Sequence, residues 1–117
     1  MNSTELFTQF YNEPFASIPK CFFTDEKYKK LSNSAKILYI FLFDRTRLSL
    51  QNGWEDADGQ IFVYCTLETA SEVLNLSKNT CIKVFRELEG VGLVRRKKQH
   101  FGQPDMIYVE AFSQYKK

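Results

Sequence analysis

Apolar residues recur at helical spacing between Ser32 and Leu48. Positions three or four residues apart lie on one face of a helix, so a repeat of this kind marks the face that turns toward a core. The repeat consists of Ala35, Leu38, Tyr39, Leu42 and Thr46. Ser32 precedes it and can accept a hydrogen bond from a free amide of the first turn. The pattern predicts a long helix that is capped by Ser32 and runs to about Leu48.

This helix is apolar on more than one side. Further large apolar residues lie outside the repeat, namely Ile37, Ile40, Phe41 and Phe43. Residues 6–15 also carry aromatic residues, namely Phe7, Phe10, Tyr11 and Phe15, and the segment ends near Pro14 without clear helix stop signals, which predicts an extended arm. Aromatic side chains are costly to leave in water. We therefore expect the arm, a second copy of the chain, or both to cover the long helix, and we expect a homodimer.

Two shorter elements flank the long helix. Thr24 can cap a short helix that ends near Leu31. Further along, Asp58-Gly59 separates Trp54 from the apolar stretch at residues 61–64, and this dipeptide suits the positive φ angles of a tight turn. The pattern predicts a β-hairpin at residues 54–64.

Two more helices follow, joined by a short turn. Thr66 can cap the first helix, whose inward residues are Ala70, Val73 and Leu74. Leu76 is placed to fill the turn, and Ser77 can cap the second helix. The buried stripe predicted for that helix consists of Cys81, Ile82, Phe85 and Leu88.

The second helix ends at Gly90 and Gly92, and two strands are predicted after it. Residues 93–98 and 106–110 have strand character, and a polar turn with Gly102 and Pro104 joins them. Two crossed helices followed by a strand pair are typical of a helix-turn-helix with a wing. The sequence therefore predicts the α+β class, as a winged helix-turn-helix with an extra N-terminal arm and β-hairpin.

The basic residues gather in the part of the chain that holds this motif. The net charge of +2 is too small to indicate a polyanionic partner by itself. Residues 77–100 hold seven basic and two acidic side chains, a local net charge of +5 that leaves −3 for the rest of the chain. A basic patch on an otherwise acidic body is typical of a protein that binds a phosphate backbone.

The second helix and the wing therefore become the candidate DNA-binding elements. A helix of about 12 residues spans roughly 18 Å and can lie in a major groove with its first turn at the base edges. The residues predicted to bind DNA from this helix are Ser77, Lys78, Asn79, Thr80, Lys83 and Arg86. Those predicted along the flanking backbone or minor groove are Arg95, Arg96, Lys97, Lys98, Gln99, His100 and Gln103.

Five of these six helix residues have a specific chemical reason for their place in this set. Ser77 and the exposed first-turn amides suit a phosphate. Asn79 has the paired donor and acceptor that fit adenine, whereas Lys78 and Lys83 suit guanine acceptors or phosphates. Thr80 suits contact with a thymine methyl group.

The sequence indicates no catalytic, metal or cofactor site. Cys21, Cys65 and Cys81 form no close pair and lie beside apolar residues, which predicts small reduced core residues. His100 is the only histidine and has no acid or cysteine at catalytic or ligand spacing. The longest apolar run falls far short of the roughly 20 residues that a membrane helix needs. We expect a single cytoplasmic domain that is not an enzyme and has no membrane association.

Several segments resemble one particular family. They include Ile18-Pro19-Lys20, Phe23-Thr24-Asp25-Glu26-Lys27-Tyr28, Ser34-Ala35-Lys36-Ile37-Leu38-Tyr39, Gly53-Trp54 and Gly102-Gln103-Pro104-Asp105. These segments are similar to the N-terminal domain of RepA-type plasmid replication initiators of low-GC Gram-positive bacteria. The resemblance implies a dimer that binds repeated double-stranded DNA sites in a plasmid origin, with its contacts at residues 77–86 and 95–103.

The resemblance also implies a division of the chain. We expect an N-terminal arm at residues 1–17, a winged-helix DNA-binding domain at 18–112, and at 113–117 the start of a linker to an absent C-terminal domain. That further domain would engage host replication proteins.

Two other functions are compatible with the same pattern. A transcriptional repressor would bind DNA by the same chemistry and would differ from an initiator in genetic context. A winged helix that serves as a protein-interaction module would place the basic patch against an acidic partner and would leave duplex DNA unbound at low salt.

Overall fold

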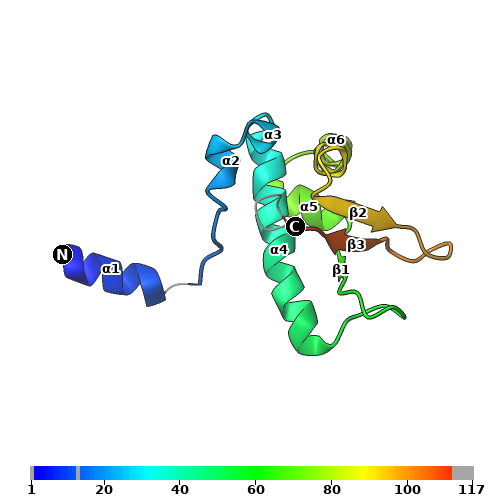
Figure 1. Cartoon of the computed structure of the whole chain (residues 1–117), viewed down its shortest axis with the longest axis horizontal. Helices are drawn as coiled ribbons and strands as arrows, with labels where there is room; N and C mark the ends of the chain where they lie inside the picture. The colour runs from blue at the N-terminus through cyan, green and yellow to red at the C-terminus, as the bar shows by residue number, and fades with distance from the viewer. Residues whose placement is uncertain (1, 13, 112–117) are drawn as a thin grey trace.

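The structure, a computed structural model, describes residues 2–12 and 14–111. The linker expected at residues 113–117 lies outside the described residues, as does Phe112 at the end of the expected domain. The elements in chain order are α1 (Ser3–Asn12), α2 (Cys21–Thr24), α3 (Glu26–Lys29), α4 (Asn33–Asn52), β1 (Val63–Tyr64), α5 (Leu67–Leu74), α6 (Lys78–Gly90), β2 (Val94–Lys97) and β3 (Met106–Val109). Figure 1 shows α1 standing away from the body, on the side opposite the β2–β3 hairpin.

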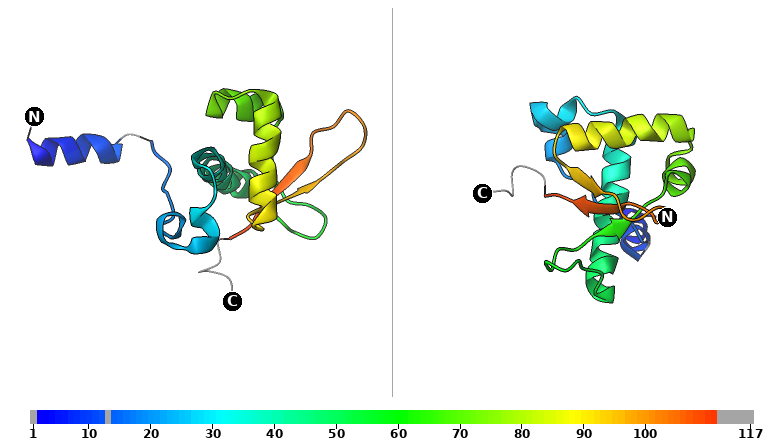
Figure 2. Two further views of the ribbon diagram at one scale, coloured as in Figure 1. Left: turned by 90° about the horizontal axis from the view of Figure 1, so that it is seen from above. Right: turned by 90° about the vertical axis from the view of Figure 1, so that its right-hand side faces the viewer.

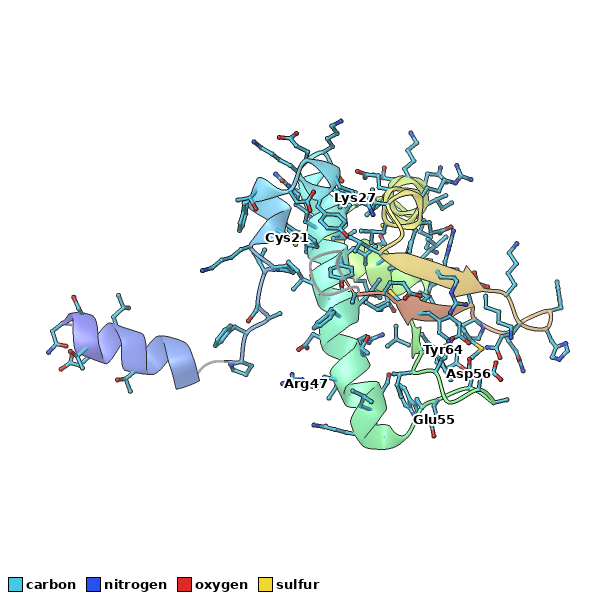
Figure 3. All side chains as sticks on the ribbon, viewed as in Figure 1. Cys21, Lys27, Arg47, Glu55, Asp56 and Tyr64 are labelled. Atoms are coloured by element: carbon cyan, nitrogen blue, oxygen red, sulfur yellow. The ribbon has the colours of Figure 1, made fainter. Side chains whose placement is uncertain are left out.

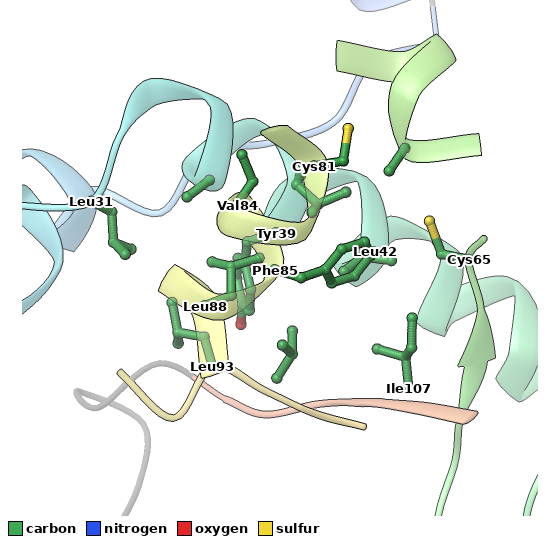
Figure 4. Close-up of a cluster of buried hydrophobic side chains, with 14 of the residues drawn as sticks. Leu31, Tyr39, Leu42, Cys65, Cys81, Val84, Phe85, Leu88, Leu93 and Ile107 are labelled. Atoms are coloured by element: carbon green, nitrogen blue, oxygen red, sulfur yellow. The ribbon is translucent and has the colours of Figure 1, made fainter. Parts of the chain in front are cut away.

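The body is a group of helices packed on a small sheet. Its three strands are antiparallel in the order β1-β3-β2, with Ile107 of β3 opposite both Val63 and Arg96. Helix α6 contacts α4, α5 and β2. Leu42, Phe85, Leu88 and Ile107 are almost fully buried where these elements meet (Figure 4). The predicted α+β class is confirmed: α5 and α6 form the helix pair, and β2 and β3 form the wing.

Side-chain caps begin the three longest helices of the body, as the sequence predicts. The hydroxyl of Ser32 accepts the amide of Ala35 at 3.1 Å, and the hydroxyl of Thr66 accepts the amide of Thr69 at 3.1 Å. At the start of α6, the hydroxyl of Ser77 accepts the amide of Thr80 at 3.2 Å. Each cap contributes about 1 kcal/mol. These local bonds fix where α4, α5 and α6 begin.

The buried faces of α5 and α6 differ from the prediction at two positions. On α6, Val84 is buried in place of Ile82, which is only partly covered. Cys81, Val84, Phe85 and Leu88 follow the spacing i, i+3, i+4, i+7, which keeps one stripe on the core side. On α5, Val73 is 39% exposed, so its predicted inward position is wrong. This eight-residue helix contacts both α4 and α6, and Ala70 is its fully buried residue.

The N-terminal segment is helical, so the prediction of an extended arm is wrong. The side chain of Asn2 accepts the amide of Glu5 at 2.8 Å, and the amide of Asn2 donates back to the carboxylate of Glu5 at 3.4 Å. This reciprocal pair is a capping box and starts α1. Pro14 lies beyond the end of the helix and does not interrupt it.

The predicted helix at residues 24–31 is divided into two short helices. Thr24 ends α2, and its hydroxyl donates to the carbonyl of Lys20 at 3.4 Å. Asp25 has an extended backbone and its side chain accepts the amide of Lys27 at 2.9 Å, so Asp25 rather than Thr24 caps α3.

The predicted hairpin at residues 54–64 is a closed loop with a single bridge, between Glu55 and Ile61. A carboxylate oxygen of Asp56 accepts the amides of Asp58 and Gln60, both at 2.9 Å, and Gly59 takes a φ of 80°. These side-chain bonds of Asp56 close the turn without a run of paired strand residues. β1 pairs with β3 instead, which joins the loop to the wing.

The three cysteines are free and buried, which confirms their prediction as small core residues. Burial raises the pKa of the Cys65 thiol to about 11, and it raises the pKa of Cys81 and of Cys21 as well. The thiols are therefore neutral side chains of the core at ordinary pH.

Candidate nucleic-acid interface

The turn between α5 and α6 holds the second helix at a fixed angle. Asn75 ends α5 in a left-handed conformation, with a φ of 56°. The amide of Leu76 donates to the carbonyl of Ser71 at 3.3 Å, and the hydroxyl of Ser71 donates to the carbonyl of Leu76. Leu76 is partly buried and packs on the core, as predicted for a residue that fills the turn. The turn therefore presents α6 as a rigid element.

The face of α6 that points away from the core is polar and cationic. Asn79, Lys83 and Arg86 are all exposed. Successive helix residues are about 100° apart, which places these three on the side opposite Cys81, Phe85 and Leu88. Among the described residues, neither Lys83 nor Arg86 takes part in an ion pair. We call Asn79, Lys83 and Arg86 the outer line of α6.

The other predicted residues of α6 lie at its N-terminal end and make local contacts. The ammonium of Lys78 lies 3.3 Å from the carboxylate of Glu68 on α5. The hydroxyls of Ser77 and Thr80 are 2.9 Å apart, and that of Ser77 also caps the helix. All three side chains are exposed, but each already has a partner within the protein.

Glu87 connects α6 to the start of α4. Its carboxylate accepts the amide of Ser32 at 2.8 Å and the hydroxyl of Ser32 at 2.7 Å. An acid in a DNA-binding helix opposes binding to phosphate, but this one faces the side of α6 next to α4. Its effect is to fix the orientation of the helix.

β2 places alternate residues on opposite faces of the sheet, as in any strand. Val94 and Arg96 face the core and α6. The guanidinium of Arg96 lies over the ring of Phe85, 5.2 Å from its centre, and its Nε pairs with the carboxylate of Glu89 at 2.5 Å. Arg96 therefore joins the wing to the C-terminal end of α6.

Arg95 is held on the opposite face of the sheet. Its guanidinium lies 4.1 Å from the centre of the Tyr108 ring, donates to the side chain of Gln60 at 3.0 Å and pairs with Glu110 at 3.6 Å. These contacts tie the wing to the loop at residues 54–62.

A carboxylate strengthens the same junction. The Tyr108 hydroxyl donates to Asp56 at 2.7 Å, and this bond holds the pKa of Asp56 below its usual value and raises the pKa of Tyr108. Figure 3 shows Asp56 and Tyr64 on the side of the sheet where β1 and the loop at residues 54–62 lie.

Lys97 and Lys98 are the wing cations that remain exposed and, within the described part of the chain, outside any ion pair. They follow Arg95 and Arg96 in the sequence and precede the turn at the tip of the wing. Figure 2 shows the β2–β3 hairpin extending beside α6, and α6 contacts β2.

The tip of the wing is a braced turn. The side-chain amide of Gln99 donates to the carbonyl of Pro104 at 2.9 Å, and the amide of Gln103 donates to the carbonyl of His100 at 3.0 Å. Gly102 takes a φ of 86°, which a residue with a side chain rarely adopts. Gln99 therefore supports the turn, while His100 and Gln103 are exposed.

The predicted DNA-binding residues thus divide into two groups. None of the thirteen residues is buried, and they lie on α6, at its cap and on the hairpin beside it. Ser77, Thr80 and Gln99 hydrogen-bond to other groups of the domain, and Lys78, Arg95 and Arg96 pair with acids. Sequence reasoning missed those partners, which are Glu68, Glu89 and Glu110, because ion pairs between distant elements leave no local pattern.

No other chemistry is evident in the described residues. Within residues 2–12 and 14–111, no three His, Cys, Asp or Glu side chains are placed to share a metal ion. In the same residues, no helix has the length and apolar character needed to cross a bilayer.

The arrangement of a short-turn helix pair, a polar outer line and a basic hairpin matches a known family. The sequence family described as the N-terminus of replication initiator protein A (RepA) matches residues 14–117. The chain belongs to this family. It is 34% identical over 108 residues to a protein of Lactobacillus helveticus named "41 kDa protein". That alignment covers 87% of this chain and 31% of the relative, so the chain spans about a third of that relative's length.

Solved structures of related domains have the same fold. A structure titled "Structure of Rep-DNA complex" superposes with a TM-score of 0.75 at 39% identity, covering 89% of this chain and 80% of the other. "N-Terminal domain of DNA binding protein" has the same TM-score and identity, covering 89% of this chain and 79% of the other. "Structure of MDR initiator" has a TM-score of 0.76 at 36% identity, covering 93% and 86%. The fold is therefore that of the N-terminal DNA-binding domains of replication initiators.

Proposed function

We propose that this domain binds double-stranded DNA at repeated sites in a plasmid replication origin and thereby takes part in replication initiation. The observation that carries the proposal is the outer line of α6, which is polar, exposed and opposite the buried stripe. Family membership supports it, as does the relative whose title names a complex with DNA. α6 has 13 residues and is about 20 Å long, enough to occupy a major groove.

The residues of α6 take different roles in this proposal. Asn79 lies in the first turn and reads adenine through its paired amide groups, and Lys83, one turn later, reaches a guanine edge or a phosphate. Arg86 lies further along and contacts the backbone. Ser77 and Thr80 keep the N-terminal end of the helix in its capped geometry, with the amides of the first turn toward a phosphate.

In this proposal the polar side chains of the wing contact the DNA without reading base edges. Lys97 and Lys98 contact phosphates that flank the major-groove site, and His100 and Gln103 lie along the minor groove. Arg95 and Arg96 hold the hairpin at the angle that places the lysines.

The test compares cognate and random duplexes by fluorescence anisotropy. Asn79→Ala or Lys83→Ala should weaken binding to an origin repeat about 5- to 150-fold and should change binding to random duplex much less, since a lost base contact costs about 1–3 kcal/mol. Lys97→Ala should weaken both duplexes by a similar factor. Lys20→Ala is the matched control, because Lys20 is an exposed cation at α2, away from the wing. Equal loss on both duplexes for Asn79→Ala would refute base reading by α6.

We further propose that the domain forms a homodimer through α1 and the outer face of α4. Ile37 and Phe43 on that face are about half exposed, and a groove of about 210 Å³ lies between Phe15 and α4. Figure 3 shows Arg47 on the same side of α4, away from the wing. α1 extends from this side and can lie against α4 of a second copy.

Sedimentation tests the dimer. Phe43→Arg should produce a monomer, whereas Val73→Arg, a matched change on α5, should leave the dimer intact. A wild-type chain that stays monomeric at high concentration while binding DNA would refute this interface.

The remaining proposals concern the longer protein. We propose that residues 113–117 begin a linker to a further domain that engages host replication proteins, and that the initiator acts in the cytoplasm without catalysis by this domain. The test measures binding of the full-length protein to purified host replication proteins, with and without residues 1–117. Binding that survives removal of residues 1–117 supports a separate domain for host proteins.

A further inference from the structure

Phe101 stands out among the apolar side chains of the surface. It is 106% exposed, whereas the other exposed large apolar residues of the described chain lie between 39% and 61%. An aromatic ring in full contact with water is unfavourable in a free domain. The ring also supports no packing within the domain, so its presence at this position calls for a partner.

The turn that carries Phe101 is held by hydrogen bonds that fix its backbone. Hydrogen bonds from Gln99 to Pro104 and from Gln103 to His100 both span residue 101 and close the turn. Gly102 has the left-handed backbone that closes the turn. The side chain is therefore presented from a braced support, and little conformational freedom of the backbone is lost when it meets a partner.

Phe101 lies beyond the paired part of the wing, in the turn at its tip. The last residue pair of the wing is Lys97 opposite Met106, and Phe101 lies four residues beyond it. The minor groove is about 7.5 Å deep, so a side chain at the tip of a projecting hairpin can enter it. Lys97 and Lys98 lie behind the tip, where they can contact the phosphates that border that groove.

We propose that Phe101 is a wedge that enters the minor groove beside the α6 site and partly unstacks a base step. This proposal rests on the proposed function, because α6 must first place the wing on the duplex. Architectural DNA-binding proteins use inserted apolar side chains in this way, and the insertion kinks the duplex. The wedge gives the wing a part in site selection, because flexible pyrimidine–purine steps unstack at lower cost than A-tracts.

The experiment uses the 117-residue chain and an origin repeat labelled with 2-aminopurine at successive steps on the wing side. Wild-type protein should raise the fluorescence at one step and should bend the duplex. Phe101→Ala should lose both signals, weaken binding about tenfold and leave the slope of affinity against salt unchanged, because no phosphate contact is removed. Phe101→Leu should keep part of the bend, since leucine is also an effective wedge.

Two controls separate the wedge from folding and from the proposed function. Phe23→Ala removes a ring that is 60% exposed on α2 and should alter neither binding nor bending. The melting temperature of Phe101→Ala should stay within about 2 °C of wild type, because the ring packs on nothing in the domain.

The outcomes are distinct. Loss of the bend and of the 2-aminopurine signal in Phe101→Ala, with the salt slope kept, supports the wedge. Wild-type affinity and bending in Phe101→Ala would overturn it while the DNA-binding function stands. A shift of Phe101→Ala from dimer to monomer, with unchanged DNA bending, would also overturn it and would assign the ring to a protein contact. If the wild-type chain bound no duplex at low salt, the proposed function itself would fail.

Discussion

Replacing Arg96 with methionine separates two roles that a wing arginine can have. Methionine keeps an unbranched stem on the Phe85 ring but removes the charge, so contacts to Glu89 and to phosphate are both lost. If Arg96 mainly joins the wing to α6, the variant loses stability. If Arg96 mainly contacts DNA, it loses affinity and keeps its stability.

The structure gives the size of the stability change. The side chains of Arg96 and Glu89 are 28% and 35% exposed, so their ion pair lies between an exposed pair and a buried one and contributes about 1 kcal/mol. The cation over Phe85 adds about 0.5 kcal/mol. With about 2.1 cal/mol/K of unfolding entropy per residue, a 117-residue chain loses about 4 °C of melting temperature per kcal/mol. Arg96→Met should therefore melt about 6 °C below wild type.

Thermal unfolding by circular dichroism and DNA binding by anisotropy measure the two effects in one set of variants. Lys97→Met is the matched control, since it removes an exposed neighbouring cation, and it should change the melting temperature by less than about 2 °C. A double-mutant cycle with Glu89→Gln should give a coupling of about 1 kcal/mol. An unchanged melting temperature for Arg96→Met, with a loss of affinity equal to that of Lys97→Met, would refute the reasoning.

Two further predictions follow from single side chains. Ser77→Ala should lower the melting temperature by about 4 °C because α6 loses its cap. Ser77→Asp should keep the stability and still weaken DNA binding through its negative charge. Equal DNA affinity of Ser77→Asp and wild type would contradict the placement of this helix end at a phosphate. Burial raises the pKa of Cys65 to about 11, above an unfolded value of about 8.5, so its contribution to stability is full below about pH 8.5 and is lost as the pH rises toward 11. Urea unfolding at pH 8 and pH 10 should show a smaller decline for Cys65→Ala than for wild type, and identical declines would exclude Cys65 as a source of the pH dependence.

The elements that local signals define were predictable from the sequence. Ser32, Thr66 and Ser77 each precede an apolar repeat, and all three accept the expected amide. The position of α6 and of the wing followed from the same signals, because a cap, a stripe and a pair of glycines all act within a few residues.

The features that long-range contacts define were not predictable. β1 pairs with β3, which lies about 43 residues further along the chain, and no pattern in residues 54–64 indicates that partner. Arg96 and Lys97 are neighbouring basic residues that look alike in the sequence. Because side chains alternate along a strand, Arg96 points toward Phe85 and Glu89. The start of α1 did have a local signal, the Asn2 and Glu5 pair, which the presence of Pro14 obscured.

The acids around the basic region leave fewer cations available than the sequence suggests. Of the seven basic residues between 77 and 100, three are paired in the free domain: Lys78 with Glu68, Arg95 with Glu110 and Arg96 with Glu89. Each phosphate contact contributes about −0.9 to the slope of log affinity against log salt.

The salt dependence therefore counts the cations that reach DNA. Four remaining cations predict a slope of about −3.6, whereas all seven predict about −6.3. Titration of an origin repeat between about 50 and 300 mM salt distinguishes these values. Glu68→Gln should release Lys78 and steepen the slope by about 0.9, and Glu72→Gln, an exposed acid on the same helix, should leave it unchanged. A wild-type slope near −6 would mean that the ion pairs break on binding and that the acids hold the cations only until phosphate replaces them.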